Sequence, residues 1–307
     1  MKREFFYGLF SFLAMVLIGA TAGSAQPILI NELMYHPSSA ELSEQWLELY
    51  NPTDTPQELA GWSFTKGISY TFPEGSRIEA GGYLVVASNL EAFRQLYPDV
   101  ENVLGDWSGN LAKNGENVEL SDAQGNSVCK VKYSNQGDWA QRQLTTEEIY
   151  NRDGWSWYCE HAGLGKSAEL VNPQMPISLG HNWEASQIMG GSPGSANSVS
   201  QSLVLQPPLL SEPRHMPAIP HSDEQVALSI RVTTPLGQAA TVMAYWREHS
   251  SFRFNSVRLH DSGNLKEHGD AVAADGVYSN FIPAQSVGTV VEFYFTAQLA
   301  GGALRTY

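Results

Sequence analysis

Ser192 is the first residue whose surroundings suggest chemistry, because Gly190-Gly-Ser-Pro-Gly194 has the spacing of a nucleophile elbow. An elbow places its serine on a sharp turn between a strand and a helix, and the next backbone N–H helps to form the oxyanion hole. The next residue here is Pro193, which has no N–H. The neighbouring sequence also lacks the alternation of strands and helices that such a fold requires. We therefore expect no hydrolytic triad at Ser192.

Ser63 and Lys66 superficially match the serine–lysine pair of acyl-enzymes. That pair requires both residues on one turn of a helix, whereas these two lie between Gly61 and Gly67 in a sequence typical of strands and turns. We interpret the match as chance. Because no other nucleophile and base stand together, the sequence predicts a protein that is not an enzyme.

An Asp-rich segment near the C-terminal end offers oxygen ligands at Asp261, Asn264, Asp270 and Asp275. Calcium takes several carboxylate and carbonyl oxygens from a single loop, so these four residues form a candidate Ca²⁺ site. Their spacing differs from that of an EF-hand. The alternative, which we favour, is a turn-rich loop in which the Asp side chains cap their own backbone. No other cofactor is expected.

Aromatic residues gather between the two halves of the chain, at Trp139, Trp155, Trp157 and Tyr158. Exposed aromatic rings would form a stacking platform for a sugar or a peptide. The favoured alternative is that residues 139–165 form a long loop whose aromatic side chains fold onto the protein.

The two cysteines, Cys129 and Cys159, are either a disulfide or two buried thiols, and their number excludes a cysteine-based zinc site.

The composition favours short strands as the elements that carry these residues. The 307-residue chain contains 27 Gly and 16 Pro, and only 16% of its residues are charged. Alternating apolar and polar residues recur in short runs such as 45–51 and 226–232, and 90–97 is the one clear helical pattern. We therefore predict an all-β protein.

The N-terminal residues have the features of a secretion signal. Lys2 and Arg3 precede an apolar stretch from Phe5 to Ile18, and small residues follow up to Ala25. This order predicts cleavage after Ala25 and a secreted or cell-surface protein, the alternative being an uncleaved membrane anchor. No later stretch is long and apolar enough to span a bilayer.

Two domains are expected, in residues 26–198 and 223–307. Between them, residues 199–222 carry five prolines and predict a semi-rigid linker with few contacts across the boundary. The second domain has the length and strand pattern of a seven-stranded Ig-like sandwich. Residues 26–198 contain 22 Asp and Glu against 9 Lys and Arg, so nucleic-acid binding is not expected.

The first domain resembles the lamin-tail domain, an Ig-like β-sandwich found in nuclear lamins and in exported bacterial proteins. The resemblance is carried by Ile30-Asn-Glu-Leu33, by Trp46-Leu-Glu-Leu-Tyr-Asn51 with Leu59-Ala-Gly-Trp62, and by Asn182-Trp183 with Gly191-Ser-Pro-Gly194. It implies structural roles for Asn31, Glu48 and Asn51, which we expect to bond turn backbones rather than a partner. More weakly, the second domain resembles the sandwich that follows lamin-tail domains in some large exported bacterial proteins.

Together these features predict an exported, non-catalytic interaction or adhesion module. Its partner would be a protein or an extracellular polymer, bound through the lamin-tail-like domain. The alternative is that the chain is the front, non-catalytic part of a larger exported protein, either kinase-like of the spore-coat-protein-H type or a hydrolase. The reading frame downstream of Tyr307 would distinguish the two.

Overall fold

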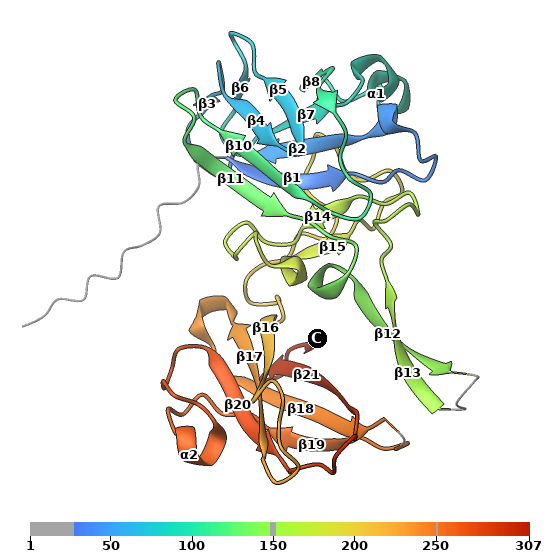
Figure 1. Ribbon diagram of the computed structural model, residues 1–307. Helices are drawn as coiled ribbons and strands as arrows, with labels where there is room; N and C mark the ends of the chain where they lie inside the picture. The colour runs from blue at the N-terminus through green and yellow to red at the C-terminus, as the bar shows by residue number, and fades with distance from the viewer. Residues whose placement is uncertain (1–27, 148–151, 250) are drawn as a thin grey trace, which may run out of the picture.

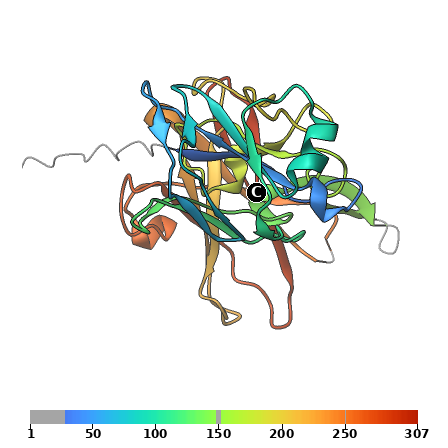
Figure 2. The same ribbon diagram turned by 90° about the horizontal axis from the view of Figure 1, so that it is seen from above.

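The computed structural model describes residues 28–147, 152–249 and 251–307, which form two β-sandwiches (Figure 1). Seen from above, the second sandwich lies beneath the first (Figure 2). Two short α-helices interrupt the strands. Four 3-10 turns are also present: Leu42–Glu44, Gly137–Trp139, Gly180–Asn182 and Pro235–Gly237. The all-β prediction is confirmed.

The first sandwich is built from two sheets that enclose one apolar core. Its larger sheet is antiparallel except for the last pair, in the order β15 (Trp183–Ala185), β14 (Ala168–Leu170), β1 (Leu29–Met34), β2 (Trp46–Tyr50), β7 (Tyr83–Ala87), β8 (Val103–Gly105). The facing sheet has the order β11 (Ser127–Lys132), β10 (Asn117–Ser121), β4 (Ser63–Lys66), β5 (Ile68–Thr71), β9 (Ser108–Gly109). A separate pair, β3 (Gln57–Glu58) and β6 (Arg77–Ile78), lies at one end.

The larger sheet is covered on both faces, which explains why its central strands are buried throughout. Leu47 and Leu49 face the core between the sheets. On the opposite face, Trp46 packs against Phe93 of helix α1 (Leu90–Leu96), in a T-shaped contact at 6.1 Å. Asn89 caps this helix by accepting a hydrogen bond from Ala92 N, and the helix ends before Pro98 as expected.

Residues 139–165 are not the irregular loop that we expected. They contain an antiparallel hairpin, β12 (Gln141–Glu147) and β13 (Arg152–Tyr158), which forms a two-stranded sheet of its own and extends away from the sandwich (Figure 1). Within the described residues the hairpin pairs with no third strand. Its strands lack the alternation of apolar and polar residues by which a half-buried strand is recognised.

The described part of the second sandwich has seven strands, six of them within residues 223–307, where seven were expected. One sheet has the order β16 (Leu209–Met216), β17 (Val226–Thr233), β20 (Val277–Ile282), and the other β19 (Asn255–Arg258), β18 (Ala240–Glu248), β21 (Val291–Leu299), β22 (Leu304–Thr306). Their facing side chains form a second core that includes Leu228, Val242 and Phe295. The short helix α2 (Leu265–His268), which the sequence did not predict, precedes β20.

Part of the expected linker, residues 199–222, is a strand of the second sandwich. Strand β16 pairs with β17, and its residue Leu210 is buried in the second core. Proline is tolerated because β16 is an edge strand and Pro213 lies where the pairing shifts between Ser211 and Arg214. The second domain therefore begins near Leu209 rather than at residue 223.

The two sandwiches touch, although the sequence predicted few contacts across the boundary. Leu210 N donates to Nδ1 of the buried His181 at 3.2 Å. The Tyr307 ring meets the His181 ring edge-on at 5.5 Å, and Arg305 lies 3.8 Å from Glu184. Burial and the nearby Arg305 lower the pKa of His181 to about 3, so this histidine is neutral at the junction.

Candidate functional site

Three glutamates form a row across neighbouring strands of the first sandwich. Glu32 on β1 lies opposite Glu169 on β14 and opposite Glu48 on β2. All three side chains are completely shielded from solvent. Directly opposed residues share one face of a sheet, so the three carboxyl groups lie side by side. We call this set the carboxyl row.

The segment 190–199, which we call the covering segment, encloses the carboxyl row. Ser192 N donates to Glu32 Oε1 at 2.8 Å, and Ser167 Oγ donates to the same oxygen. Ser192 Oγ donates to Glu169 Oε1 at 2.8 Å, while Ser198 Oγ and Val199 N donate to Glu169 Oε2 at 2.8 and 3.0 Å.

Glu48 holds the middle of the covering segment. Gly194 N donates to Glu48 Oε2 at 2.5 Å, and Asn31 Nδ2 donates to Glu48 Oε1 at 2.9 Å. Asn31 also binds Asn197, through Nδ2 to Oδ1 at 2.7 Å. Through Glu32, Glu48 and Glu169, the covering segment is tied to three strands at once.

Burial changes the acidity of these groups. It raises the pKa of Glu48 to about 8, against the opposing effect of the hydrogen bonds from Gly194 and Asn31. It also raises the pKa of Glu32 well above its ordinary value, with further increases from the charges of Glu48 and Glu169. A glutamic acid with such a pKa keeps its proton near neutral pH.

Ser192 is not arranged as a nucleophile. Its side chain is buried, its hydroxyl donates to carboxyl groups of the row, and the next residue, Pro193, has no N–H. The two buried histidines of this domain serve other contacts. His181 accepts from Leu210 N, and His161 must donate Nε2–H to the Trp139 carbonyl at 2.9 Å.

Glu48 and Asn51 bond turn backbone groups as expected, whereas the Asn31 amide donates to the side chains of Glu48 and Asn197. Asn51 is fully buried at the end of β2. Its Nδ2 donates to the carbonyl oxygens of Thr55, Ile78 and Glu79 at 2.8, 3.1 and 3.0 Å. Its Oδ1 accepts from Thr53 N at 3.0 Å. One carboxamide thereby joins the turn after β2 to the chain entering β7.

The candidate aromatic platform is divided by the fold. Trp139 is buried and stacks on Trp183 at 5.2 Å, so it cannot belong to an exposed surface. Trp157 on β13 is 46% exposed, and the Arg142 guanidinium lies 4.6 Å from its ring centre. Tyr158 is half-buried, and the side chain of Trp155 lies outside the described residues.

Cys129 and Cys159 are free thiols rather than a disulfide. Cys129 is buried in the core and its Sγ accepts from Ile30 N at 3.2 Å. Cys159 lies beside His161, 3.3 Å from Nε2. Burial raises the pKa of Cys129 to about 12 and that of Cys159 to about 11, so both thiols are poor nucleophiles.

Three of the four candidate calcium ligands come together in the second sandwich. Asp261, Asp270 and Asp275 each bring a carboxylate oxygen within 4.8 Å of the others. Their oxygens already accept backbone hydrogen bonds. Asp270 Oδ2 accepts from Ser262 N and Gly263 N at 2.5 and 2.6 Å, and Asp261 and Asp275 accept from residues 275–277. This is the turn-capping pattern that we expected as the alternative.

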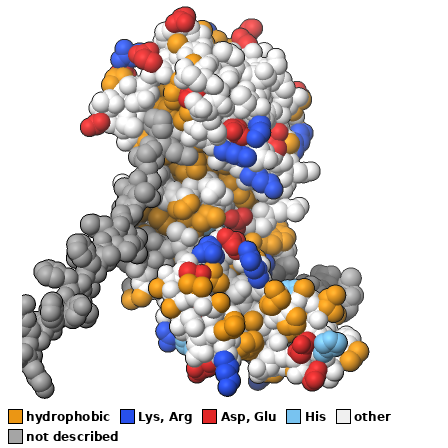
Figure 3. All heavy atoms as spheres, turned by 60° about the vertical axis from the view of Figure 1, so that its left-hand side comes forward, with side chains coloured by type: hydrophobic (Ala, Val, Ile, Leu, Met, Phe, Trp, Pro, Cys, Tyr) orange, Lys and Arg blue, Asp and Glu red, His pale blue; other side chains and the backbone are white. Residues whose placement is uncertain are grey.

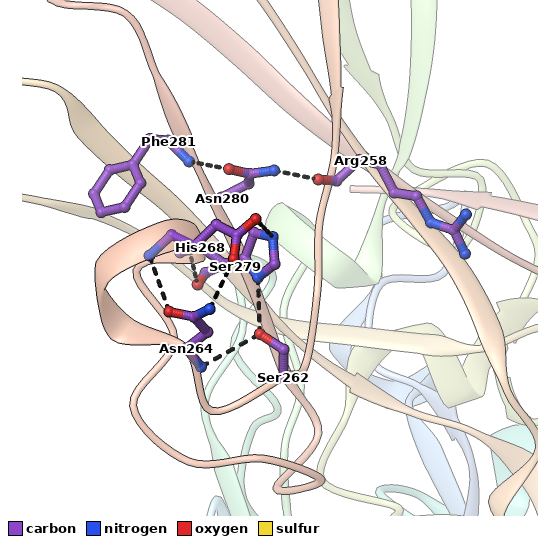
Figure 4. A network of polar contacts seen from close by, with 8 residues as sticks. Arg258, Ser262, Asn264, His268, Ser279, Asn280 and Phe281 are labelled. Atoms are coloured by element: carbon purple, nitrogen blue, oxygen red, sulfur yellow. Dashed lines mark hydrogen bonds and ion pairs between the residues drawn. The ribbon is translucent and has the colours of Figure 1, made fainter.

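Asn264, the fourth candidate ligand, is the N-cap of helix α2. Its Oδ1 accepts from Glu267 N at 3.1 Å, and its backbone N–H donates to Ser262 Oγ (Figure 4). Ser262 Oγ in turn lies 2.8 Å from His268 Nδ1. The amide oxygen is therefore occupied by the helix that it caps.

Sequence reasoning missed the carboxyl row as a unit. Glu32 and Glu48 were noticed as parts of motifs, and Glu169 was not noticed at all. The available signal was that Glu48 and Glu169 each stand between apolar residues of a short strand, where burial is expected on both sides. Because cross-strand register cannot be obtained from periodicity alone, their alignment emerged only from the fold.

The family model described as Lamin Tail Domain matches residues 21–135. This segment of the chain is similar to the lamin tail domain. Among the described residues, the match covers β1 to β11, and therefore Glu32, Glu48 and Asn51, but not β14 or the covering segment. Comparison with curated proteins gives no match. No helix within the described ranges is long and apolar enough to cross a membrane.

Proposed function

We propose that this chain is an exported, non-catalytic binding module that contacts a protein or an extracellular polymer through its lamin-tail-like domain. The observation that carries the proposal is the match of residues 21–135 to the lamin tail domain, an Ig-like interaction fold. The signal-like N-terminal sequence supports a secreted or cell-surface location, although residues 1–27 lie outside the described structure.

The chemistry of the described polar residues agrees with binding rather than catalysis. Ser192 and Cys129 are engaged in buried contacts, and the half-buried Cys159 lies against His161. Burial lowers the pKa of His161 to about 4, so this histidine is neutral and fixed between Tyr35 and the Trp139 carbonyl. A general base must instead reach a substrate proton and hold a pKa near the working pH.

The β12–β13 hairpin provides the exposed part of the proposed binding surface. Among the described aromatic side chains of the set, Trp157 is the one that remains exposed, and the guanidinium of the half-buried Arg142 lies against its ring. Hydrophobic side chains also gather at the waist between the domains, with charges of both signs around them (Figure 3). Aromatic and arginine side chains are enriched among residues that dominate binding energies.

Co-sedimentation of residues 26–307 with insoluble cell-envelope material tests the proposal. We expect saturable binding that falls at least roughly tenfold in affinity for Trp157→Ala, since loss of a binding hot spot costs about 2 kcal/mol or more. The matched control is Phe252→Ala, which removes a 71% exposed aromatic side chain from the second sandwich. This control should bind as the unaltered chain does.

Treating the envelope with protease before the assay distinguishes the two partner classes. Binding that survives protease indicates a polymer, and binding that disappears indicates a protein. Equal loss in Trp157→Ala and Phe252→Ala would contradict the assignment of the surface to the hairpin. Absence of saturable binding to either preparation would contradict the proposed function itself.

A further inference from the structure

The carboxyl row is buried without a compensating positive charge in its hydrogen-bonded surroundings. Its partners are the hydroxyl, amide and backbone groups of serine, asparagine, glycine and valine residues. The sequence 187–199 that contains the covering segment has no charged residue. Burying an ionised carboxylate without a counter-charge is costly, and three adjacent ones would also repel each other.

Neighbouring elements add little positive charge. Glu184 on β15 lies opposite Glu169, and its own partner is Arg305, at 3.8 Å. Tyr97, at the end of α1, donates its hydroxyl to the Gly190 carbonyl at 2.8 Å. Lys166, next to Ser167, is paired with Glu160. Tyr83 on β7, Glu44 before β2 and Asp99 after α1 bring no positive charge.

The hydrogen bonds themselves indicate a bound proton. Ser192 Oγ lies 2.8 Å from Glu169 Oε1 and 3.2 Å from Glu32 Oε2. One hydroxyl proton serves only one of these oxygens well. A proton on Glu32 relieves the repulsion between the two groups, as in other pairs of close carboxylates.

We propose that residues 190–199 act as a proton-dependent latch, which closes on the sheet when Glu32 and Glu48 hold protons and opens when they ionise. The latch leads directly to the second domain. Val199 is buried, and two residues later Gln201 N donates to the Val171 carbonyl at 3.1 Å before the chain enters β16. Opening the latch therefore loosens the connection between the two sandwiches.

The direction of the pH dependence follows from proton linkage. In the closed form Glu48 has a pKa of about 8, whereas an exposed glutamate has the ordinary value of 4.5. The closed form thus binds protons more tightly, is fully favoured below pH 4.5, and loses stability as the pH rises toward 8. With these two pKa values, the closing equilibrium falls roughly a hundredfold between pH 6 and pH 9 from Glu48 alone.

Hydrogen exchange of the full chain at pH 6 and pH 9, corrected for intrinsic exchange rates, tests the latch. We expect the protection of amides in 187–199 to fall roughly a hundredfold, while that of β10 and β11 changes far less. Glu32→Gln with Glu48→Gln replaces two acids by neutral amides and should largely remove the difference. Glu184→Gln is the matched control. Glu184 lies opposite Glu169 on the next strand and is half-exposed, and its partner is Arg305 rather than the latch.

The proposal is overturned if the amide protection of residues 187–199 changes less than threefold between pH 6 and pH 9 in the unaltered chain. It is also overturned if this protection changes equally in the double variant. Infrared spectroscopy of the unaltered chain gives an answer that does not depend on whether the variants fold. The C=O band of protonated carboxylic acid should be present at pH 6 and lost by pH 9. Its absence at pH 6 overturns the proposal as well.

Discussion

Replacing Asn51 by alanine should destabilise the first sandwich severely. The carboxamide is fully buried and donates to three carbonyl oxygens, of Thr55, Ile78 and Glu79, while accepting from Thr53 N. Alanine keeps the backbone but leaves these groups without their partner. An unsatisfied buried polar group costs about 1–3 kcal/mol.

The magnitude follows from which of these groups water can reach. The Ile78 carbonyl faces Asn51 in a buried environment, whereas the contacts to Thr55 and Glu79 are partly buried. Water can therefore replace part of what is lost at the last two, and we expect a total cost of roughly 3–5 kcal/mol. A typical domain has a free energy of unfolding of about 5–15 kcal/mol. The change should thus lower Tm by roughly 6–20 °C.

Urea unfolding followed by tryptophan fluorescence measures this cost, since Trp46 and Trp183 are buried in the same domain. Asn135→Ala is the matched control, because it removes a similar amide that makes an exposed hydrogen bond of 3.3 Å to Asn114. The control should cost less than about 0.5 kcal/mol. A cost below about 1 kcal/mol for Asn51→Ala would refute the reasoning that this amide holds the turns together.

Three further predictions concern other parts of the chain. Gly191→Ala should lower Tm far more than Gly125→Ala. Both glycines have φ near +85°, but only at Gly191 would an added Cβ overlap Glu32 Oε1. Equal losses of Tm in the two variants would contradict this prediction. Asp270→Asn should destabilise the second sandwich with or without Ca²⁺, because the Asp270 carboxylate accepts backbone hydrogen bonds. Any rise in Tm in CaCl₂ relative to EDTA should vanish in the double variant Asp261→Asn with Asp275→Asn. Calorimetry should show that Arg305→Ala moves the unfolding transitions of the two domains apart, because Arg305 lies at their junction; an unchanged profile would mean that the junction carries little energy.

The all-β fold, helix 90–96 and the hairpin 117–132 could be predicted because apolar periodicity and turn residues mark them clearly. The strand β16 was mistaken for a linker because proline normally argues against a strand, and an edge position with a shifted register is invisible in the sequence. The hairpin β12–β13 was missed because its two strands, which form a sheet of their own, show no clear alternation of apolar and polar residues.

The candidate site could be predicted only where local chemistry determines it. Asn51 could be assigned a structural role because Asn beside turn residues usually bonds nearby backbone. The burial of Trp139 depends on Trp183, and the carboxyl row depends on the pairing of β14, β1 and β2. Both are contacts between residues far apart in the sequence, which local patterns do not reveal.

A binding isotherm of residues 26–307 on cell-envelope material, with turnover of envelope components monitored in the same sample, tests the central claim most directly. A non-catalytic binding module should give saturable binding and leave the envelope chemically unchanged. Turnover that disappears in Ser192→Ala, or no saturable binding at any concentration, would contradict the claim.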